Sequence, residues 1–376
     1  MAVVFEKPSL WQRVWPLLRG FDLLLLAGVL VLAGMGLLAM YSSGFDHGTR
    51  FVDHGRNMLI AAGIMFVVAQ IPPQRLMSLA VPVYTVGVAL LVAVALFGIT
   101  KKGAQRWVNV GVVIQPSELL KIATPLMLAW WFHRREGHTR PIDFVGAFML
   151  LAIPVGLIMK QPDLGTALAI GFGGVVVMFL AGLPLRWFVW GGIGAMVAAP
   201  IAFFFGLHDY QRRRVFTFLD PENDPLGSGY HITQSKIAIG SGGLTGKGFN
   251  EGSQSHLDYL PEPHTDFVFA TMAEEWGLVG GLAVLLAFFL ILRWGWSVSR
   301  AARDRLGSLL AGGMVATIFF YVAINLMMVM GLAPVVGIPL PFMSHGGSSM
   351  MTNMICLGTL MMINRWNRRT SGALLG

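Results

Sequence analysis

The chain has 376 residues, of which 55% are hydrophobic and only 12% are charged. Soluble domains carry about 25% charged residues, so this composition predicts an integral membrane protein and excludes a disordered or collagen-like chain. The formal net charge of +8 comes from Lys and Arg scattered between apolar runs, which does not indicate a nucleic-acid-binding stripe. The single cysteine, Cys356, excludes an internal disulfide, and the sequence has no Cys/His cluster typical of a structural zinc site.

Ten apolar runs approach or reach the roughly 20 residues that a helix needs to cross a bilayer. They lie near residues 21–42, 57–71, 78–98, 117–133, 143–159, 165–183, 187–206, 267–292, 307–331 and 348–364. The sequence therefore predicts an all-α polytopic membrane protein with ten transmembrane helices, built as one membrane domain over residues 1–376. An internal repeat is not visible, so an inverted-repeat transporter finds no support.

The first apolar run is longer than the 7 to 15 residues of a signal-peptide core, which predicts a retained helix. Residues 1–20 before it mix Trp11 and Trp15 with Arg13 and Arg19. Tryptophan and basic residues together are typical of a segment that lies in the membrane interface. We expect residues 1–20 to lie on the cytoplasmic surface.

Lys and Arg in the short loops predict the orientation, because cytoplasmic loops carry the excess. Alternate loops and the two terminal segments hold fifteen Lys and Arg residues, against six in the opposite set of short loops. Both termini are therefore predicted to be cytoplasmic. The long loop over residues 207–266, between the seventh and eighth runs, then lies outside. It holds 8 of the 19 acidic residues together with Gly-rich and aromatic stretches, and we expect it to be folded and functional.

Asp266, in the stretch PEPHTDF, stands where this loop meets the eighth run. A carboxylate there meets both water and lipid, which suggests a functional role. The alternative is a helix N-terminal charge, which the helix dipole favours. Glu274 and Glu275 lie two turns deeper, and either function or packing against a polar partner is compatible with their position.

The Gly-rich stretch GSGGLTGKG precedes Asp266 but lacks the GxxxxGK[ST] spacing, so a nucleotide-binding loop is not indicated. Its backbone amides, together with Lys236 and Lys247, are candidates to hold an anion. Flexible turns between short elements are an equally supported alternative.

Three further charges lie close to apolar runs. Glu118 and Lys121 are three residues apart and share a helix face, and Asp163 falls at the same outer end within reach of Lys121. Charges near hydrocarbon usually pair and often mark a functional site. A polar cavity and structural pairing alone both remain open.

Arg106 and Trp107, in the stretch GAQRWVNVG, belong to the same outer surface. The stretch GLAPVVGIPLPFMSHGGSS before the tenth run has three prolines, and non-helical backbone at that depth must line a cavity or be buried in protein. With Asn325, Ser344 and Ser348 nearby, we expect a polar cavity open to the outside, the alternative being an ordinary loop cap.

The motifs GAQRW, QPSELLK, QPDLGTA, DPLGSGYHITQSKIAIGSGGLTGKG, PEPHTDFVFATMAEEWG and GIPLPFMSHGGSS occur in this order along the chain. In this the chain resembles the SEDS family (shape, elongation, division and sporulation) over nearly its whole length. The resemblance implies a ten-helix fold with a large outer loop between the seventh and eighth helices. It also implies a peptidoglycan glycosyltransferase of the bacterial cytoplasmic membrane that polymerises lipid II during elongation. The partners it implies are a class B penicillin-binding transpeptidase and other membrane proteins of the elongation complex.

By the same resemblance, Asp266 is the essential acidic residue of the family. Glu118, Lys121 and Asp163 match positions of the family's cavity, and Arg106 belongs to a motif near the lipid-linked substrate. The family usually reads SYGGS where this chain has SHGGS, so a role for that tyrosine hydroxyl does not carry over to His345.

The implied reaction is attack of a sugar 4-hydroxyl on the anomeric carbon of a lipid-linked donor, with undecaprenyl pyrophosphate as leaving group. Pyrophosphate leaves as a stable anion, so one carboxylate, Asp266, suffices as general base. Arg106, Lys121 or a divalent cation such as Mg²⁺ or Mn²⁺ are alternatives for stabilising the leaving group. A lipid-precursor flippase and a noncatalytic scaffold for the transpeptidase are the competing functions.

Overall fold

The structure is a computed structural model of the chain. It describes residues 22–43, 49–101, 104–109, 111, 113–161, 163–201, 203–204, 212, 216–218, 220, 227–257, 259–260 and 262–372. The predicted interfacial segment 1–20 lies outside these residues, as does most of the first third of the predicted loop 207–266.

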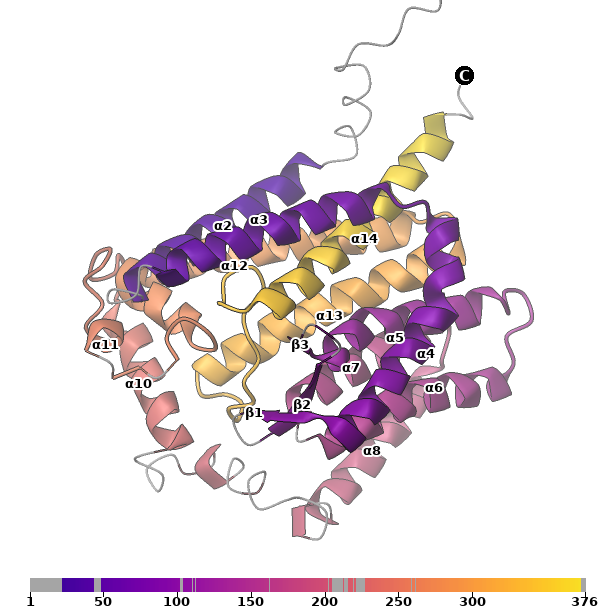
Figure 1. Cartoon of the computed structure of the whole chain (residues 1–376), viewed down its shortest axis with the longest axis horizontal. Helices are drawn as coiled ribbons and strands as arrows, with labels where there is room; N and C mark the ends of the chain where they lie inside the picture. The colour runs from indigo at the N-terminus through magenta and orange to yellow at the C-terminus, as the bar shows by residue number, and fades with distance from the viewer. Residues whose placement is uncertain are drawn as a thin grey trace, which may run out of the picture.

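Each of the ten apolar runs contains a helix (Figure 1). These helices are α2 (Leu23–Ser43), α3 (Thr49–Gln70), α4 (Pro73–Phe97), α5 (Pro116–His133), α6 (Pro141–Lys160), α7 (Leu164–Leu180), α8 (Leu185–Ile201), α12 (Val268–Ala301), α13 (Arg305–Val329) and α14 (Gly347–Gly372). In the described part of the chain, six of them (α2, α3, α4, α6, α12 and α13) are long and apolar enough to cross a membrane. The protein is therefore a helical, multi-pass membrane protein.

Helix α13 lies at the centre of the bundle and packs against α5, α7, α12 and α14, while α2 packs on α12 and α3 on α14. In the most apolar 18-residue stretch of α13, 78% is buried inside the protein. Small residues permit this enclosure, because a Cβ at Gly313 would lie 2.7 Å from Val177 and 2.9 Å from Pro125. Helix α13 thus meets mostly protein where an outer helix meets lipid.

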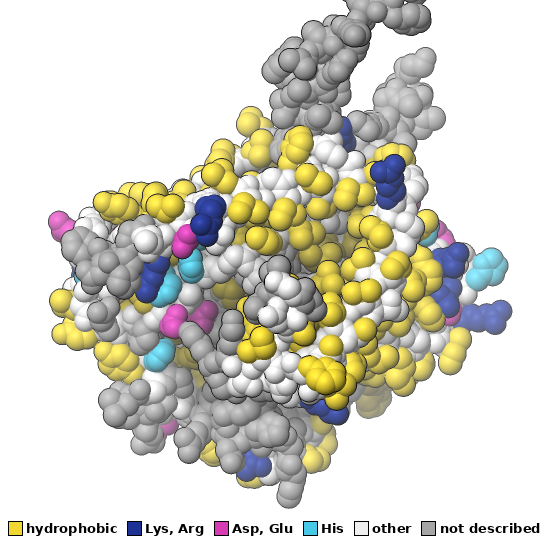
Figure 2. All heavy atoms as spheres, in the orientation of Figure 1, with side chains coloured by type: hydrophobic (Ala, Val, Ile, Leu, Met, Phe, Trp, Pro, Cys, Tyr) yellow, Lys and Arg dark blue, Asp and Glu magenta, His cyan; other side chains and the backbone are white. Residues whose placement is uncertain are grey.

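Charged side chains gather toward two opposite ends of the visible face, with hydrophobic side chains between them (Figure 2). This distribution matches a protein with a hydrocarbon layer around its middle. One end, called here the cavity end, carries a small sheet and the helices α10 (Ser228–Ser241) and α11 (Ser253–His256) (Figure 1). The short connection between α5 and α6 lies at the other end.

The sheet departs from the all-α prediction. Three antiparallel strands, in the order β1-β2-β3, join α4 to α5. They are β1 (Ile99–Lys101), β2 (Ala104–Asn109) and β3 (Val113–Ile114). Strands this short carry little alternating pattern, and they pair here because the chain turns back on itself twice within sixteen residues. The sheet carries Arg106 and Trp107 on β2.

The described part of the long loop is folded. Helix α10 packs against α12 and α13. The Ser235 hydroxyl of α10 is buried and donates a hydrogen bond to the Val329 carbonyl, at 2.7 Å. This contact joins the loop to the end of α13 that lies nearest the cavity.

Candidate active site

A cavity of about 450 Å³ lies between the sheet, the first turn of α5 and the non-helical segment before α14. Polar side chains from distant parts of the chain meet there. Its lining consists of Arg106, Trp107, Gln115, Glu118, Lys121, Asp163, Thr166, Glu262, Thr265, Asp266, Tyr321, Gly337, Ile338, Pro339, His345, Gly346, Ser348 and Ser349. The cavity combines acidic, basic and hydroxyl groups, as a site for a polar substrate requires.

Most of the residues predicted from sequence meet in this cavity. They are Arg106, Trp107, Glu118, Lys121, Asp163, Asp266 and Ser348. Ser344, Lys236 and Lys247 are not among the lining residues. Ser344 is buried behind the cavity, and the two lysines lie on the folded outer loop.

Asp266 lies in a turn just before α12, and its backbone is held from two sides. The buried Asn325 amide donates to the carbonyls of Asp266 (2.8 Å) and Ile338 (2.7 Å). The Ser344 hydroxyl donates to the Thr265 carbonyl at 2.5 Å. The turn is therefore fastened both to α13 and to the segment before α14.

A glycine in the left-handed backbone region lies beside the Asp266 carboxylate. Gly337 has φ of +71°, a conformation that L-residues rarely adopt. A Cβ at this position would lie 3.4 Å from Asp266 Oδ2. The carboxylate and Gly337 both line the cavity.

Glu118 and Lys121 form a buried ion pair in the first turns of α5, as the spacing predicts. Lys121 Nζ lies 2.6 Å from Glu118 Oε1, and their side chains are 3% and 14% exposed. The Thr352 hydroxyl donates to the second Glu118 oxygen at 2.8 Å. Lys121 Nζ also lies 4.5 Å from the centre of the Tyr321 ring. These partners offset the cost of burying two charges.

Asp163 pairs with Arg106, and both line the cavity with Lys121. Arg106 Nη1 lies 3.8 Å from Asp163 Oδ1, and the Gln115 amide donates to Asp163 Oδ2 at 3.2 Å. The same carboxylate caps α7 by accepting from the Thr166 amide. The aspartate therefore positions Arg106 and connects strand β2 to the start of α7.

Tyr321 and Glu262 are cavity residues that sequence reasoning missed. Tyr321 lies within the apolar run of α13, where only the packing determines which face meets the cavity. Glu262 lies in the PEPHTDF motif, so its closeness in sequence to Asp266 is the signal that was available.

His345 lies at the cavity wall, where the family usually has tyrosine. Its amide donates to the His264 carbonyl at 2.8 Å, and its ring centroid is 5.9 Å from that of His54. Burial lowers the pKa of His345, Arg50 lowers it further, and Asp53 opposes the shift. These surroundings favour the neutral form of the ring.

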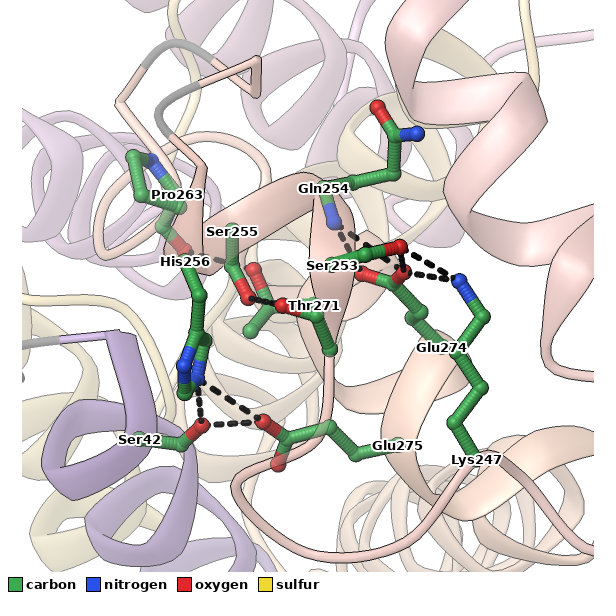
Figure 3. A network of polar contacts seen from close by, with 11 residues as sticks. Ser42, Lys247, Ser253, Gln254, Ser255, His256, Pro263, Thr271, Glu274 and Glu275 are labelled. Atoms are coloured by element: carbon green, nitrogen blue, oxygen red, sulfur yellow. Dashed lines mark hydrogen bonds and ion pairs between the residues drawn. The ribbon is translucent and has the colours of Figure 1, made fainter.

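A second polar network binds the outer loop to α12 (Figure 3). Lys247 Nζ donates to Glu274 Oε1 at 2.5 Å and to the Ser253 hydroxyl at 2.8 Å. The Ser42 hydroxyl of α2 donates to Glu275. Both glutamates are buried, and each has a polar partner in this network.

The described residues do not form a metal site built from protein ligands alone. Within the described ranges, His, Cys, Asp and Glu side chains form no group of three or more that could hold one. The cavity carboxylates Glu118 and Asp163 are instead paired with Lys121 and Arg106. We therefore assign no step to Mg²⁺ or Mn²⁺.

The sequence and the fold both match known proteins. The family profile described as "Cell cycle protein", which joins FtsW, RodA and SpoVE, matches residues 16–369. The chain is 45% identical over 371 residues to the peptidoglycan glycosyltransferase MrdB of Escherichia coli, covering 97% of this chain and 98% of that protein.

Two solved structures share the fold. One is a chain of a peptidoglycan synthase complex, described as coordinating polymerization and crosslinking, with TM-score 0.80 and 31% identity over 92% of this chain and 98% of that one. The other is the Thermus thermophilus rod shape determining protein RodA, with TM-score 0.69 and 28% identity over 92% and 97%. Fold and site thus define the class of this protein, which is a multi-pass helical membrane protein with a polar cavity at one end. The chain belongs to the FtsW/RodA/SpoVE family of cell cycle proteins, the SEDS family.

Proposed function

We propose that this chain is a peptidoglycan glycosyltransferase that polymerises lipid II into β-1,4-linked glycan strands during elongation of a rod-shaped bacterial cell. The observation that carries the proposal is that one cavity contains a carboxylate, Asp266, and two cationic side chains, Arg106 and Lys121. The 45% identity to a peptidoglycan glycosyltransferase over 97% of the chain supports the substrate class.

In the proposed reaction, the 4-hydroxyl of the acceptor sugar attacks the anomeric carbon of a lipid-linked donor. The bond from that carbon to the pyrophosphate oxygen breaks, and the hydroxyl proton passes to the Asp266 carboxylate. A single displacement inverts an α-linked donor to a β-1,4 linkage. Glycosidases add a carboxylic acid to protonate a poor leaving group. Pyrophosphate leaves as a stable anion, so one general base is enough here.

Arg106 is the better candidate to meet the pyrophosphate. Its side chain is 30% exposed and lies 3.8 Å from Asp163, whereas Lys121 is 3% exposed and lies 2.6 Å from Glu118. A guanidinium also binds phosphate oxygens through two parallel hydrogen bonds. We assign Lys121 to the positive potential of the wall, and Trp107 to contact with the substrate.

The remaining predicted residues take supporting roles in this proposal. Ser348 lines the cavity and is available to bind substrate hydroxyls. Ser344 positions the turn that carries Asp266. We assign no substrate contact to Lys236 and Lys247, since both lie on the outer loop and neither lines the cavity.

We further propose ten membrane spans in one domain over residues 1–376, with both termini cytoplasmic and the cavity end facing the periplasm or cell exterior. The excess of Lys and Arg in the opposite set of loops supports this orientation. The partners are a class B penicillin-binding transpeptidase and other membrane proteins of the elongation complex. The similar chain found in a peptidoglycan synthase complex supports a crosslinking partner.

The test is polymerisation of lipid II by the purified complex with a transpeptidase whose own active site is inactivated. Asp266→Asn keeps the shape of the side chain and removes the base, so we expect the rate to fall about 10²- to 10⁴-fold. The matched control is Glu251→Gln, an exposed acid on the outer loop, which keeps wild-type turnover.

Thermal unfolding checks that both variants are folded. Near-normal turnover of Asp266→Asn overturns the assignment of the base. Headgroup translocation without polymer identifies a flippase, and neither activity identifies a scaffold.

A further inference from the structure

Helix α12 breaks at Gly277, and the glycine-rich loop over residues 242–249 forms hydrogen bonds with the helix on both sides of the break. Gly277 has φ of 62° and ψ of −157°, a conformation open essentially to glycine alone. Before the break, the amides of Lys247 and Gly248 donate to the carbonyls of Glu274 (3.0 Å) and Glu275 (3.1 Å). The loop thus donates hydrogen bonds to carbonyls at the point where the helix is interrupted.

After the break, the roles reverse. The amides of Leu278 and Val279 donate to the loop carbonyls of Gly243 (2.9 Å) and Leu244 (3.1 Å). Backbone groups freed where a helix meets the membrane are stabilised by bonds within the protein, because lipid tails offer them no partner. Four backbone hydrogen bonds satisfy that condition here and make the glycine-rich loop part of the helix wall.

The spacing of two tryptophans on α12 fixes the level of the break. From the break at Gly277, next to Trp276, α12 runs nineteen residues to Trp296, which is about 28 Å along a helix and close to the hydrocarbon thickness of a bilayer. Both are exposed, and tryptophan concentrates at the two membrane–water interfaces. The break beside Trp276 therefore falls at the interface on the cavity side.

A second helix, α2, also places an aromatic side chain at this height relative to the membrane. Tyr41, near the end of α2, stacks on Phe249 of the glycine-rich loop with ring centroids 6.0 Å apart, and Phe249 lies 6.4 Å from Trp276. Tyr41 is 56% exposed and Phe249 is 41% exposed. Exposed rings from α2, the loop and α12 thus form one continuous aromatic row.

Leu244 extends this surface. It is 70% exposed, and its neighbours Leu278 and Val279 are 53% and 64% exposed. The one charged residue of the glycine-rich loop, Lys247, is paired with Glu274. A surface that is apolar, aromatic and without net charge suits a lipid bilayer, with no preference for anionic lipids.

We propose that the glycine-rich loop is a membrane-contact element, inserted through Leu244 and Phe249 into the headgroup region of the leaflet on the cavity side. Its partner is the lipid surface. This inference goes beyond the proposed function, and its test reads no activity.

Nitroxide labels on the full chain in phosphatidylcholine nanodiscs test the proposal. The background is Cys356→Ala, which removes the single cysteine. Leu244→Cys carries the test label, Glu251→Cys, two residues after the glycine-rich loop, is the water control, and Leu282→Cys is the lipid control on α12. Accessibility to oxygen relative to a water-soluble nickel reagent is expected to be several-fold higher at position 244 than at 251, approaching the value at 282. A value at 244 equal to that at 251 overturns the proposal, as does shielding from both reagents.

A second measurement uses the unmodified chain, so that it does not depend on any variant folding. A photoactivatable phosphatidylcholine is incorporated into the same nanodiscs, and adducts are mapped by mass spectrometry. We expect adducts on residues 242–249 and none on 250–256. Labelling around Leu282 without labelling of the glycine-rich loop contradicts the proposal.

Discussion

Two Glu–Lys ion pairs in this protein, one buried and one partly exposed at its lysine, have the same chemistry and different surroundings. Lys121 lies 2.6 Å from Glu118, and Lys247 lies 2.5 Å from Glu274. The first pair forms part of the cavity wall, while the second fastens a loop to a helix. The comparison teaches that a buried ion pair marks a site only when it also faces open space.

The partners of each pair show the difference. Glu118 accepts from Thr352 of α14, and its lysine lies against Tyr321 of α13, so three helices meet at the cavity. Glu274 is satisfied within the outer loop, because the Ser253 hydroxyl and the Gln254 amide also donate to it. Removing the lysine therefore leaves the two glutamates in very different states.

Breaking the cavity pair is expected to have the largest effect. Lys121→Met leaves Glu118 as a buried charge without its cation, which costs about 3–5 kcal/mol in free energy of unfolding. Loss of positive charge from the wall should also lower the polymerisation rate about 10²- to 10³-fold. Unfolding and lipid II polymerisation of the same preparation measure both effects.

The double variant Glu118→Gln/Lys121→Met separates stability from catalysis. It removes both charges, so we expect most of the lost stability to return while polymerisation stays low. Recovery of polymerisation along with stability would show that this pair only supports the fold.

The loop pair should respond more weakly. Lys247→Met leaves Glu274 with its hydroxyl and amide donors, so we expect a loss of about 1–3 kcal/mol in free energy of unfolding. Polymerisation by the folded protein should stay near the wild-type rate. The matched control Lys236→Met removes an exposed lysine of α10 and should change stability by less than about 0.5 kcal/mol. A large loss of polymerisation by Lys247→Met at unchanged stability would contradict the comparison.

The smallest expected effect is on the stability of the fold at low pH. Because burial lowers the pKa of His345, the unfolded chain takes up a proton before the folded chain does. The histidine contributes nothing above the unfolded pKa of about 6.5 and reduces stability as the pH falls below it. His345→Tyr should therefore lose less thermal stability than wild type between pH 7 and pH 5. His138→Tyr, at an exposed site, serves as control, and an equal flattening there would refute the role of burial.

The helices could be predicted from the sequence because each span must be apolar over most of its length. Helix α12 nevertheless runs to Ala301, beyond the predicted limit at residue 292. Backbone hydrogen bonds of a helix do not need apolar side chains, so the helix continues past Arg293, where the apolar run stops. The sheet was missed because its strands are two to six residues long. A pattern so short carries no usable period.

Charges in apolar surroundings predicted much of the cavity, since Arg106, Glu118, Asp163 and Asp266 all line it. The role of the glycine-rich loop could not be predicted in this way. Its composition is compatible with binding an anion, but its glycines allow backbone contact with the broken helix. A Cβ at Gly246 would collide with the Glu275 carbonyl. Such a contact is visible only once the partner segment is in place.

The enclosure of α13 also bears on how the chain is assembled in the membrane. This helix buries Thr317, Tyr321 and Asn325 among neighbours that are synthesised both before and after it. Tyr321 lies against Lys121 of α5, and the Asn325 amide donates to the carbonyls of Asp266, before α12, and Ile338, after α13. The bond to Ile338 forms only after the segment beyond α13 has been synthesised, so a ribosome-bound intermediate that lacks this segment leaves the buried Asn325 amide without one of its two acceptors.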